Sequence, residues 1–168
     1  MSIPFDKLEP PKWGGPVPEP VDREPFALGD DVVVDPPVVL SPMAAVTNPP
    51  YRMICREMGA GLVVTEMIEA KGLSHRSDTC MEMLDIRPCE HPVSVQIFGK
   101  RPEEMAAGAQ VVQEAGADAV DVNMGCPMRK VVSSGHGAAL LQQPEKVRRI
   151  FDAMSSAVDI PVTGKIRA

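Results

Sequence analysis

The most informative segment of this chain reads Ala119-Val120-Asp121-Val122-Asn123-Met124-Gly125-Cys126-Pro127. It begins as a short apolar run that predicts a buried strand, and it ends in a turn. Gly125 lets the backbone bend sharply, and Pro127 fixes the direction in which the chain leaves. Cys126 therefore stands where a strand passes into a loop. In barrels of alternating strands and helices these strand ends carry the chemistry, although a lone cysteine is more often a small buried hydrophobe.

Apolar segments of strand length alternate with helical segments along the rest of the chain. Strands are expected at residues 38–43, 62–67, 92–99, 119–123 and 161–167, and helices at 49–58, 73–84, 102–115 and 144–158. A short hairpin that turns at Gly29-Asp30 is expected before them, over residues 26–34. Short apolar strands separated by helices indicate a parallel sheet that is covered by helices.

Two α/β architectures share this alternation, the open doubly wound sheet and the TIM barrel. A dinucleotide-binding doubly wound sheet has a glycine-rich turn after its first strand, whereas the first strand expected here runs into Ser41-Pro42-Met43-Ala44. This difference favours the barrel. A complete barrel has eight strands and about 250 residues. Because five strands are expected in 168 residues, we predict an α/β fold of the TIM (β/α)8 type, truncated after about five strands.

The composition places few other constraints on function. Residues 1–25 are rich in proline and predict a flexible N-terminal segment, which leaves residues 26–168 for the barrel portion. That segment lacks the basic start and apolar run of a secretory signal, and no apolar run is long enough to span a bilayer. We therefore expect a cytoplasmic protein without a membrane. The net charge of −6 and the pI near 5.1 give no global sign of nucleic-acid binding.

The cysteines do not form a metal or redox motif. None of Cys55, Cys80, Cys89 and Cys126 pairs with another at a two-residue spacing, which argues against a zinc ribbon and a thioredoxin-like site. We expect no metal, and we expect reduced thiols in the cytoplasm.

Several motifs together resemble the tRNA-dihydrouridine synthase family, in particular its bacterial B-type branch. The central motif covers residues 120–131 and continues through residues 135–141. Four others occur in the family's order at residues 40–44, 65–67, 95–99 and 161–167. The resemblance runs from about residue 26 to the end. It departs from the family at Ala45, where glycine is frequent, at Gly164, where a branched residue is usual, and at His136, where alanine or glycine is more common.

The resemblance implies the N-terminal part of an FMN-binding TIM barrel that is followed by a small helical domain. It implies reduction of uridine to 5,6-dihydrouridine in tRNA, with FMN as cofactor and NADPH or NADH as reductant, by an enzyme that is monomeric when full length. In such enzymes reduced FMN delivers hydride to carbon 6 of uracil, and a cysteine protonates carbon 5 from the opposite face. Cys126 matches that cysteine, and a free thiol is mostly protonated at neutral pH, as an acid must be.

The resemblance also assigns residues to the cofactor. Lys165 would place a cation near flavin N1 and so stabilise the anionic reduced form. The amide of Gln96 both donates and accepts hydrogen bonds, which suits the pyrimidine edge of a flavin. Pro42, Met43 and Ala44 would line the isoalloxazine ring.

The substrate residues that the resemblance implies lie around the cysteine. Asn123 would hold the target uracil or a flavin edge. Arg129 and Lys130 would contact RNA phosphate, although exposed basic pairs are often only solvated.

Two other interpretations remain at this stage. Another FMN-dependent TIM-barrel oxidoreductase, similar to dihydroorotate dehydrogenase, would share the strand-end lysine and asparagine. It would not share Asn123 to Pro127 together with Lys130-Val131. The second alternative is an inactive truncated product, and we expect residues 1–168 alone to bind FMN weakly and not to reduce tRNA.

Overall fold

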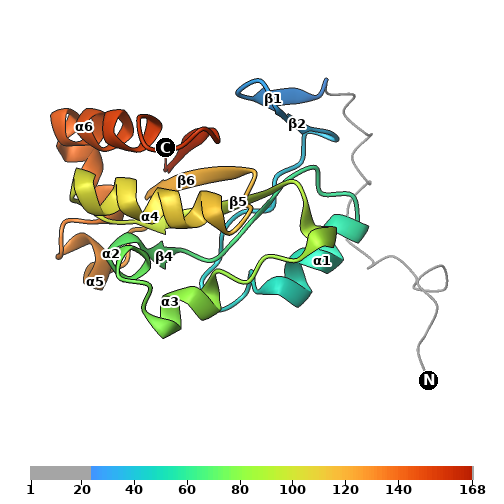
Figure 1. The fold of residues 1–168 in the computed structure, drawn as a ribbon, viewed down its shortest axis with the longest axis horizontal. Helices are drawn as coiled ribbons and strands as arrows, with labels where there is room; N and C mark the ends of the chain where they lie inside the picture. The colour runs from blue at the N-terminus through green and yellow to red at the C-terminus, as the bar shows by residue number, and fades with distance from the viewer. Residues whose placement is uncertain (1–23, 168) are drawn as a thin grey trace, which may run out of the picture.

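The structure, a computed structural model, describes residues 24–167 (Figure 1). The flexible segment expected at residues 1–25 therefore lies outside the described residues, apart from Glu24 and Pro25. The strands are β1 (Phe26–Leu28), β2 (Val32–Val34), β3 (Val63–Val64), β4 (Ile68–Glu69), β5 (Val93–Phe98), β6 (Ala119–Met124) and β7 (Val162–Ile166). The helices are α1 (Pro49–Glu57), α2 (Ala70–Ser74), α3 (Asp78–Met83), α4 (Pro102–Glu114), α5 (Arg129–Val132) and α6 (Pro144–Ser155), with the 3-10 helices η2 (Pro88–Glu90) and η3 (Gly137–Gln142).

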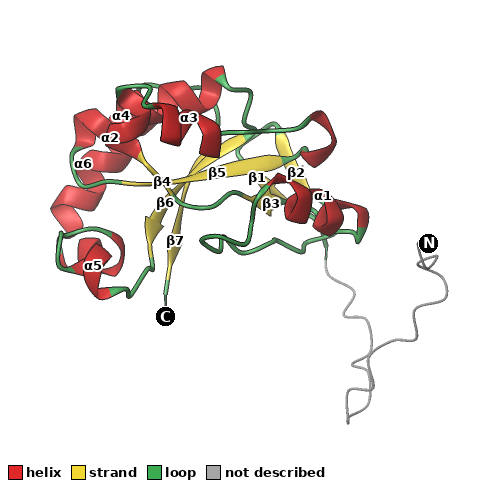
Figure 2. Cartoon of the chain, turned by 90° about the horizontal axis from the view of Figure 1, so that it is seen from below, coloured by secondary structure: helices red, strands yellow, loops and turns green. Residues whose placement is uncertain are grey.

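The main sheet is parallel, and its strands lie side by side in the order in which the chain makes them. The order is β3-β5-β6-β7. Strand β3 pairs with the beginning of β5, and β4 pairs with the end of β5. Helices α2, α4 and α6 cover one face of this curled sheet, with α4 in the middle (Figure 2). The predicted α/β class with a parallel sheet under helices is therefore confirmed. Because all strands of the sheet run the same way, their C-terminal ends meet at one edge.

The core lies between the sheet and this helical layer. A Leu, Val or Met side chain contributes about 1.5–3 kcal/mol when fully buried, so the contact between these layers accounts for much of the stability. Its wholly buried members include Val95, Ile97, Val120, Val122, Met105, Val112, Ile150 and Met154. Gly108 lets α4 pass close to α2, since a Cβ at this position would lie 3.1 Å from the carbonyl oxygen of Ala70.

The predicted hairpin is confirmed. Strands β1 and β2 pair antiparallel, with Phe26 opposite Val34. Gly29 occupies the turn with a φ of 61°, a left-handed conformation that glycine adopts without strain. Between this hairpin and the inner face of the sheet lies a cavity of about 330 Å³.

The first expected strand, at residues 38–43, is wrong as predicted. It is reduced to a single parallel bridge between Val39 and Leu62, beside a hydrogen bond from Leu40 N to Leu62 O of 2.9 Å. Proline has no N–H to donate to a ladder, and Pro42 ends the pairing after this point. The second expected strand, at residues 62–67, is interrupted between β3 and β4. Here the N–H of Gln96 donates to the hydroxyl of Thr65 (3.1 Å) instead of to a ladder carbonyl.

The helix expected at residues 73–84 is also wrong, because the chain forms α2 and α3 instead. Arg76 lies between them with a φ of 49°, which breaks the helical path. The N–H of Ser77 donates to Gly72 O (3.0 Å) and closes the end of α2. Gly72 has no room for a Cβ because Cys80 of α3 packs against it. Within residues 24–167, no helix is both long and apolar enough to cross a membrane.

Candidate functional site

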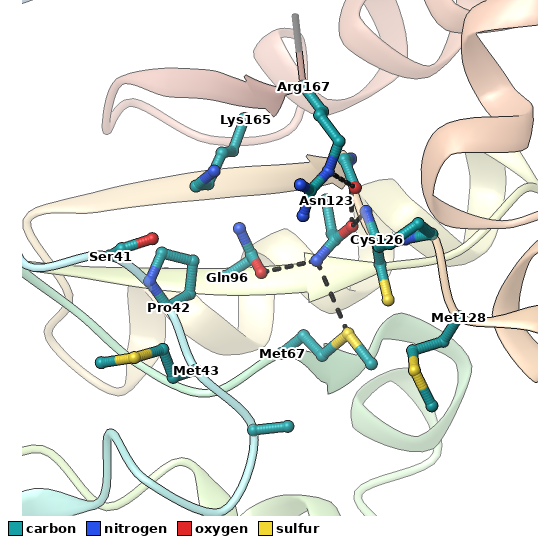
Figure 3. A pocket seen from close by; sticks show the side chains of 13 residues that line it. Ser41, Pro42, Met43, Met67, Gln96, Asn123, Cys126, Met128, Lys165 and Arg167 are labelled. Carbon is teal, nitrogen blue, oxygen red and sulfur yellow. Dashed lines mark hydrogen bonds between the residues drawn. The ribbon is translucent and has the colours of Figure 1, made fainter.

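A cavity of about 340 Å³ opens at the C-terminal edge of the parallel sheet (Figure 3). Seven residues predicted from the sequence line it together: Pro42, Met43, Ala44, Gln96, Asn123, Cys126 and Lys165. They come from the loop after Val39, from β5, β6 and β7, and from the loop after β6. The structure thus brings residues that are far apart in the chain to one concave surface.

Strand alternation explains why polar side chains face the inner side of the sheet. Successive residues of a strand point to opposite faces. Val120 and Val122 of β6 belong to the helix-facing core, so Asp121 and Asn123 point away from the helices. The same alternation in β5 places Gln96 on the inner face, between its helix-facing neighbours Val95 and Ile97. The inner face is therefore polar near the ends of these strands.

The register of the strands brings these polar residues into contact. Gln96 lies opposite Asp121, and Asn123 lies opposite Lys165. Gln96 Nε2 donates to Asp121 Oδ2 (2.7 Å), and Asn123 Nδ2 donates to Gln96 Oε1 (2.7 Å). Thr163 of β7 donates its hydroxyl to Asp121 Oδ1 (2.7 Å). Gln96, Asp121 and Asn123 are 1%, 7% and 8% exposed, so this network is shielded from water.

Asp121 is a buried carboxylate among these neutral partners. Burial raises the pKa of its carboxyl above the ordinary value. The hydrogen bonds from Gln96 and Thr163 and the charge of Lys165 lower the same pKa and oppose part of that shift. Removing a charged group from water is unfavourable unless it is paired, and here two donors and a nearby ammonium compensate for part of that cost.

The loop that carries Cys126 is held from several sides. The side-chain oxygen of Asn123 accepts from the N–H of Gly125 (3.3 Å) and from that of Cys126 (3.1 Å). The carbonyl of Cys126 accepts from the N–H of Ala138 (3.1 Å). Arg167 Nε donates to the carbonyl of Gly125 (3.2 Å). The Cys126 thiol is half-buried and borders the cavity.

Gly125 and Gly137 permit this packing. A Cβ at Gly125 would lie 3.2 Å from the backbone of Ile166, so the loop passes close to the end of β7. Gly137 has a φ of 59°, and a Cβ there would lie 2.7 Å from the carbonyl oxygen of Cys126. Glycine is thus required at Gly137 both for its conformation and for the close contact.

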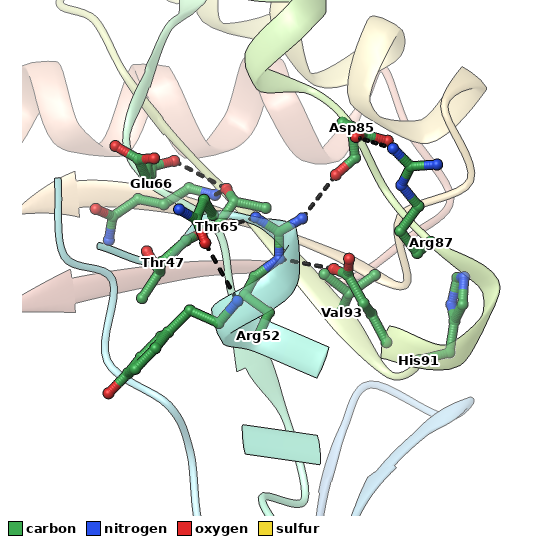
Figure 4. Close-up of polar contacts among 12 residues, drawn as sticks. Thr47, Arg52, Thr65, Glu66, Asp85, Arg87, His91 and Val93 are labelled. Atoms are coloured by element: carbon green, nitrogen blue, oxygen red, sulfur yellow. Dashed lines mark hydrogen bonds and ion pairs between the residues drawn. The ribbon is translucent and has the colours of Figure 1, made fainter. Parts of the chain in front are cut away.

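The buried side chain of Arg52 (Figure 4) is linked through Thr47 to the wall formed by Pro42, Met43 and Ala44. Thr47 closes the turn after this wall, since its hydroxyl donates to Met43 O (3.1 Å). Arg52 donates to Thr47 O (2.7 Å), to Asp85 O (2.6 Å) and to Glu90 Oε2 (2.7 Å). Arg52 and Glu90 form an ion pair that is 1% and 0% exposed.

A family model described as dihydrouridine synthase matches residues 39–168. The chain belongs to the dihydrouridine synthase family. The tRNA-dihydrouridine synthase B of Escherichia coli strain K12 is 44% identical over 133 residues, which cover 77% of this chain and 40% of that protein. The tRNA-dihydrouridine synthase B of Xanthomonas campestris is 40% identical over 134 residues, covering 80% of this chain and 40% of the relative.

A probable tRNA-dihydrouridine synthase of Rhodobacter capsulatus is 40% identical over 149 residues, covering 82% of this chain and 43% of that protein. The chain therefore spans about 40% of the length of the curated relatives that it matches. The predicted family, similar to the B type, is confirmed.

Ala45, one of the departures from the family, has a backbone conformation that is unfavourable for alanine. Its φ of 61° is left-handed, a conformation that costs a residue with a Cβ about 1–2 kcal/mol. A glycine, which the family often has here, adopts it freely. The N–H of Ala45 donates to the carboxylate of Glu66, and this contact holds the residue in place. At Gly164, the space that a side chain would occupy is filled by Met124 and Phe151.

Six further cavity residues of this family member were not predicted as site residues: Ser41, Met67, Gly125, Pro127, Met128 and Arg167. Arg167 could have been predicted as a cavity residue. It lies two residues after Lys165 in an extended segment, and residues at this spacing point to the same face. Met67 lies between β3 and β4 and accepts from Asn123 Nδ2 through its sulfur (3.5 Å). No sequence pattern distinguished the methionines from core residues.

The remaining predicted residues lie outside the cavity. Arg129 and Lys130 are exposed on α5, the short helix after the Cys126 loop, and do not line the cavity.

His136 has partners that the sequence did not reveal. Its Nδ1 lies 3.0 Å from the hydroxyl of Ser134, and its ring packs edge-on against Phe98. Burial lowers the pKa of the His136 imidazole, and the charge of Lys100 acts in the same direction.

The donor set around the cavity fits a flavin ring better than it fits a metal. Across the part of the chain that the structure describes, no cluster of three or more His, Cys, Asp or Glu side chains could hold a metal ion. The cavity instead offers two amides, an ammonium and thioether sulfurs. Amides can match an edge that alternates donors and acceptors, and methionine side chains pack well on aromatic faces.

Proposed function

We propose that this chain forms the flavin-binding and proton-donating part of an FMN-dependent enzyme that reduces uridine to 5,6-dihydrouridine in tRNA, with NADPH or NADH as reductant. One observation carries this proposal. Cys126, Asn123, Gln96 and Lys165 converge on a single cavity at the C-terminal edge of a parallel sheet. Active sites of TIM barrels form at this edge, and we propose that the curled sheet is part of such a barrel. The names of the curated relatives support the same substrate.

Each residue has a stated part in the proposal. Lys165, Gln96 and the wall of Pro42, Met43 and Ala44 would hold FMN, which when bound and reduced supplies the hydride. The Lys165 ammonium favours negative charge beside it, as the reduced ring requires. Cys126 holds a proton on Sγ and presents it from a loop whose backbone is fixed.

The substrate would meet the protein at and beside the cavity. The amide nitrogen of Asn123 donates one N–H to Gln96 Oε1, and its other N–H contacts the sulfur of Met67, which is a weak acceptor. We propose that this second N–H is offered to a carbonyl of uracil or of the flavin. Arg129 and Lys130 are the proposed contacts to RNA phosphate. The same proposal includes a cytoplasmic enzyme that is monomeric when full length.

The test is Cys126→Ala in the complete gene product. Loss of the proton donor should lower dihydrouridine formation by roughly 10²–10⁴-fold, the usual contribution of a general acid, while FMN stays bound. Cys89→Ala is the matched control, because Cys89 is exposed and does not line the cavity. Turnover of the Cys126→Ala variant near that of the wild type would refute the assignment. The same assay with dihydroorotate in place of tRNA tests the alternative barrel oxidoreductase.

A further inference from the structure

The hydrogen-bond network on the inner face has two ends of opposite and fixed polarity. At one end, both carboxyl oxygens of Asp121 accept, one from Gln96 and the other from Thr163. At the other end, the backbone N–H groups of Gly125 and Cys126 can only donate. Between these ends lie two side-chain amides, and each could be placed with its oxygen and nitrogen exchanged.

Only one arrangement of the two amides satisfies both ends. Gln96 turns its NH₂ to Asp121 and its oxygen to Asn123. Asn123 then turns its NH₂ to Gln96 and its oxygen to the Cys126 loop (Figure 3). Reversing Gln96 would set its carbonyl against a carboxylate oxygen and would place two amide nitrogens against each other. Because these groups are buried, water cannot repair such a mismatch.

We propose that Asp121 is a positioning residue that sets the amide orientation of Gln96 and Asn123 and, through Asn123, the backbone of the Cys126 loop. Asp121 lines the cavity beneath the hairpin and not the cavity at the strand ends, and hydrogen bonds through Gln96 and Asn123 connect it to the Cys126 loop. This inference rests on the proposed function only in its assignment of the cavity to flavin and uracil. With this orientation, Asn123 presents a donor toward the cavity, which selects a ligand that offers a carbonyl there.

The first test measures the Cys126 loop without cofactor or turnover. In the flavin-free complete gene product, each cysteine is alkylated with iodoacetamide, and the rates are read by peptide mass spectrometry. Asp121→Leu keeps the approximate size of the side chain and removes both acceptors, whereas an asparagine could still accept from Gln96 while donating to the Thr163 hydroxyl. We expect Asp121→Leu to raise the alkylation rate of Cys126 several-fold relative to Cys89, the exposed internal reference. We also expect it to weaken FMN binding several-fold.

The second test moves the carboxylate by one position. In the double variant Asp121→Asn with Gln96→Glu, the new amide at position 121 can donate to the new carboxylate at position 96. That carboxylate still accepts from Asn123 Nδ2, so the orientation of Asn123 is restored. The alkylation rate of Cys126 should return toward the wild-type value, whereas FMN affinity should stay low because the Gln96 donor is gone. Thr163→Val removes only the bond to the other carboxylate oxygen and should leave the Cys126 rate unchanged.

A positioning role of Asp121 differs from a purely electrostatic or structural role in these readouts. If Asp121 served only as a countercharge for Lys165, Asp121→Leu would change FMN affinity and leave the Cys126 rate unaltered. That result, or a double variant that alkylates as fast as Asp121→Leu, overturns the proposal. If both variants fail to show a cooperative thermal transition, Asp121 is a folding residue and the proposal is wrong. None of these readouts needs turnover, so an inactive but correctly alkylating protein would overturn the proposed function alone.

Discussion

The buried ion pair of Arg52 and Glu90 permits a quantitative prediction for Arg52→Met. The two side chains are 1% and 0% exposed, so neither has water to replace a lost partner. The substitution leaves the Glu90 carboxylate buried without its cation. It also removes the donors to Thr47 O and Asp85 O, which Arg52 contacts at 2.7 Å and 2.6 Å.

The magnitude follows from these losses. Removing one partner of a buried ion pair costs about 3–5 kcal/mol, because the remaining charge is uncompensated. We therefore expect Arg52→Met to lower the free energy of unfolding by about 3–5 kcal/mol. Adding Glu90→Gln removes the unpaired charge and should recover part of this loss. The two carbonyls stay without their donor, so recovery should be incomplete.

The assay is urea unfolding of the flavin-free complete gene product, with a flavin titration of each variant. Arg148→Met is the matched control, since Arg148 forms only exposed ion pairs with Glu145 and Asp152. Exposed pairs contribute about 0–1 kcal/mol. FMN binding should also weaken in Arg52→Met, because Thr47 and the Met43 wall lose their support. A loss of stability no larger than that of Arg148→Met, or a double variant as unstable as the single one, would refute the reasoning.

Three further predictions concern other residues. Lys165→Met should weaken FMN binding and lower the midpoint potential of the flavin, because the cation beside the reduced ring is lost. The control variant Lys71→Met changes an exposed residue of α2 and should alter neither property. An unaltered midpoint potential and unaltered FMN retention in Lys165→Met would show that this side chain acts elsewhere. Ala45→Gly should stabilise the fold by about 1 kcal/mol or less, since relief of the left-handed strain is partly offset by the entropy of glycine, and a lower unfolding midpoint would contradict this. Because burial raises the pKa of Asp121 above its ordinary value of 3.8, the folded state binds this proton more tightly than the unfolded state, and the group's contribution to stability falls as pH rises from that value through the folded pKa. The free energy of unfolding is measured against pH for the wild type and for Asp121→Asn, and this decline should occur in the wild type only. Parallel pH dependence of the two proteins would disprove the prediction.

Much of the helical layer and sheet could be predicted because local signals mark it clearly. Proline at the first turn and glycine after the last turn bound α4, and apolar residues that recur at alternate positions mark β5 and β6. Two of the wrong predictions have identifiable causes. Pro42 stops the first strand from pairing, and the left-handed Arg76 divides one expected helix. The short helices α5 and η3 were not predicted.

The residues of the candidate site also fall into those that the sequence predicts and those that only the structure reveals. The seven cavity residues could be predicted because strand ends of a parallel sheet meet at one edge and the family motifs mark them. The pair of Arg52 and Glu90 could not, because 38 residues separate its members and no spacing rule links them. Asp121 lies within the central sequence motif, but its contact with Gln96 depends on the register between β5 and β6, which the sequence does not state.

The alternation of side chains in β5 and β6 makes the length of these strands as important as their composition. The residues that pack under the helices and the residues that face the cavity occupy alternate positions of the same short strands. Inserting or deleting one codon within either strand would exchange the two sets, turning Gln96 or Asn123 into the core and a valine toward the cavity. Point substitutions can be tolerated on one face at a time, whereas a single-residue change in length damages both stability and chemistry. Natural variation in length should therefore be confined to the loops that join these strands to their helices.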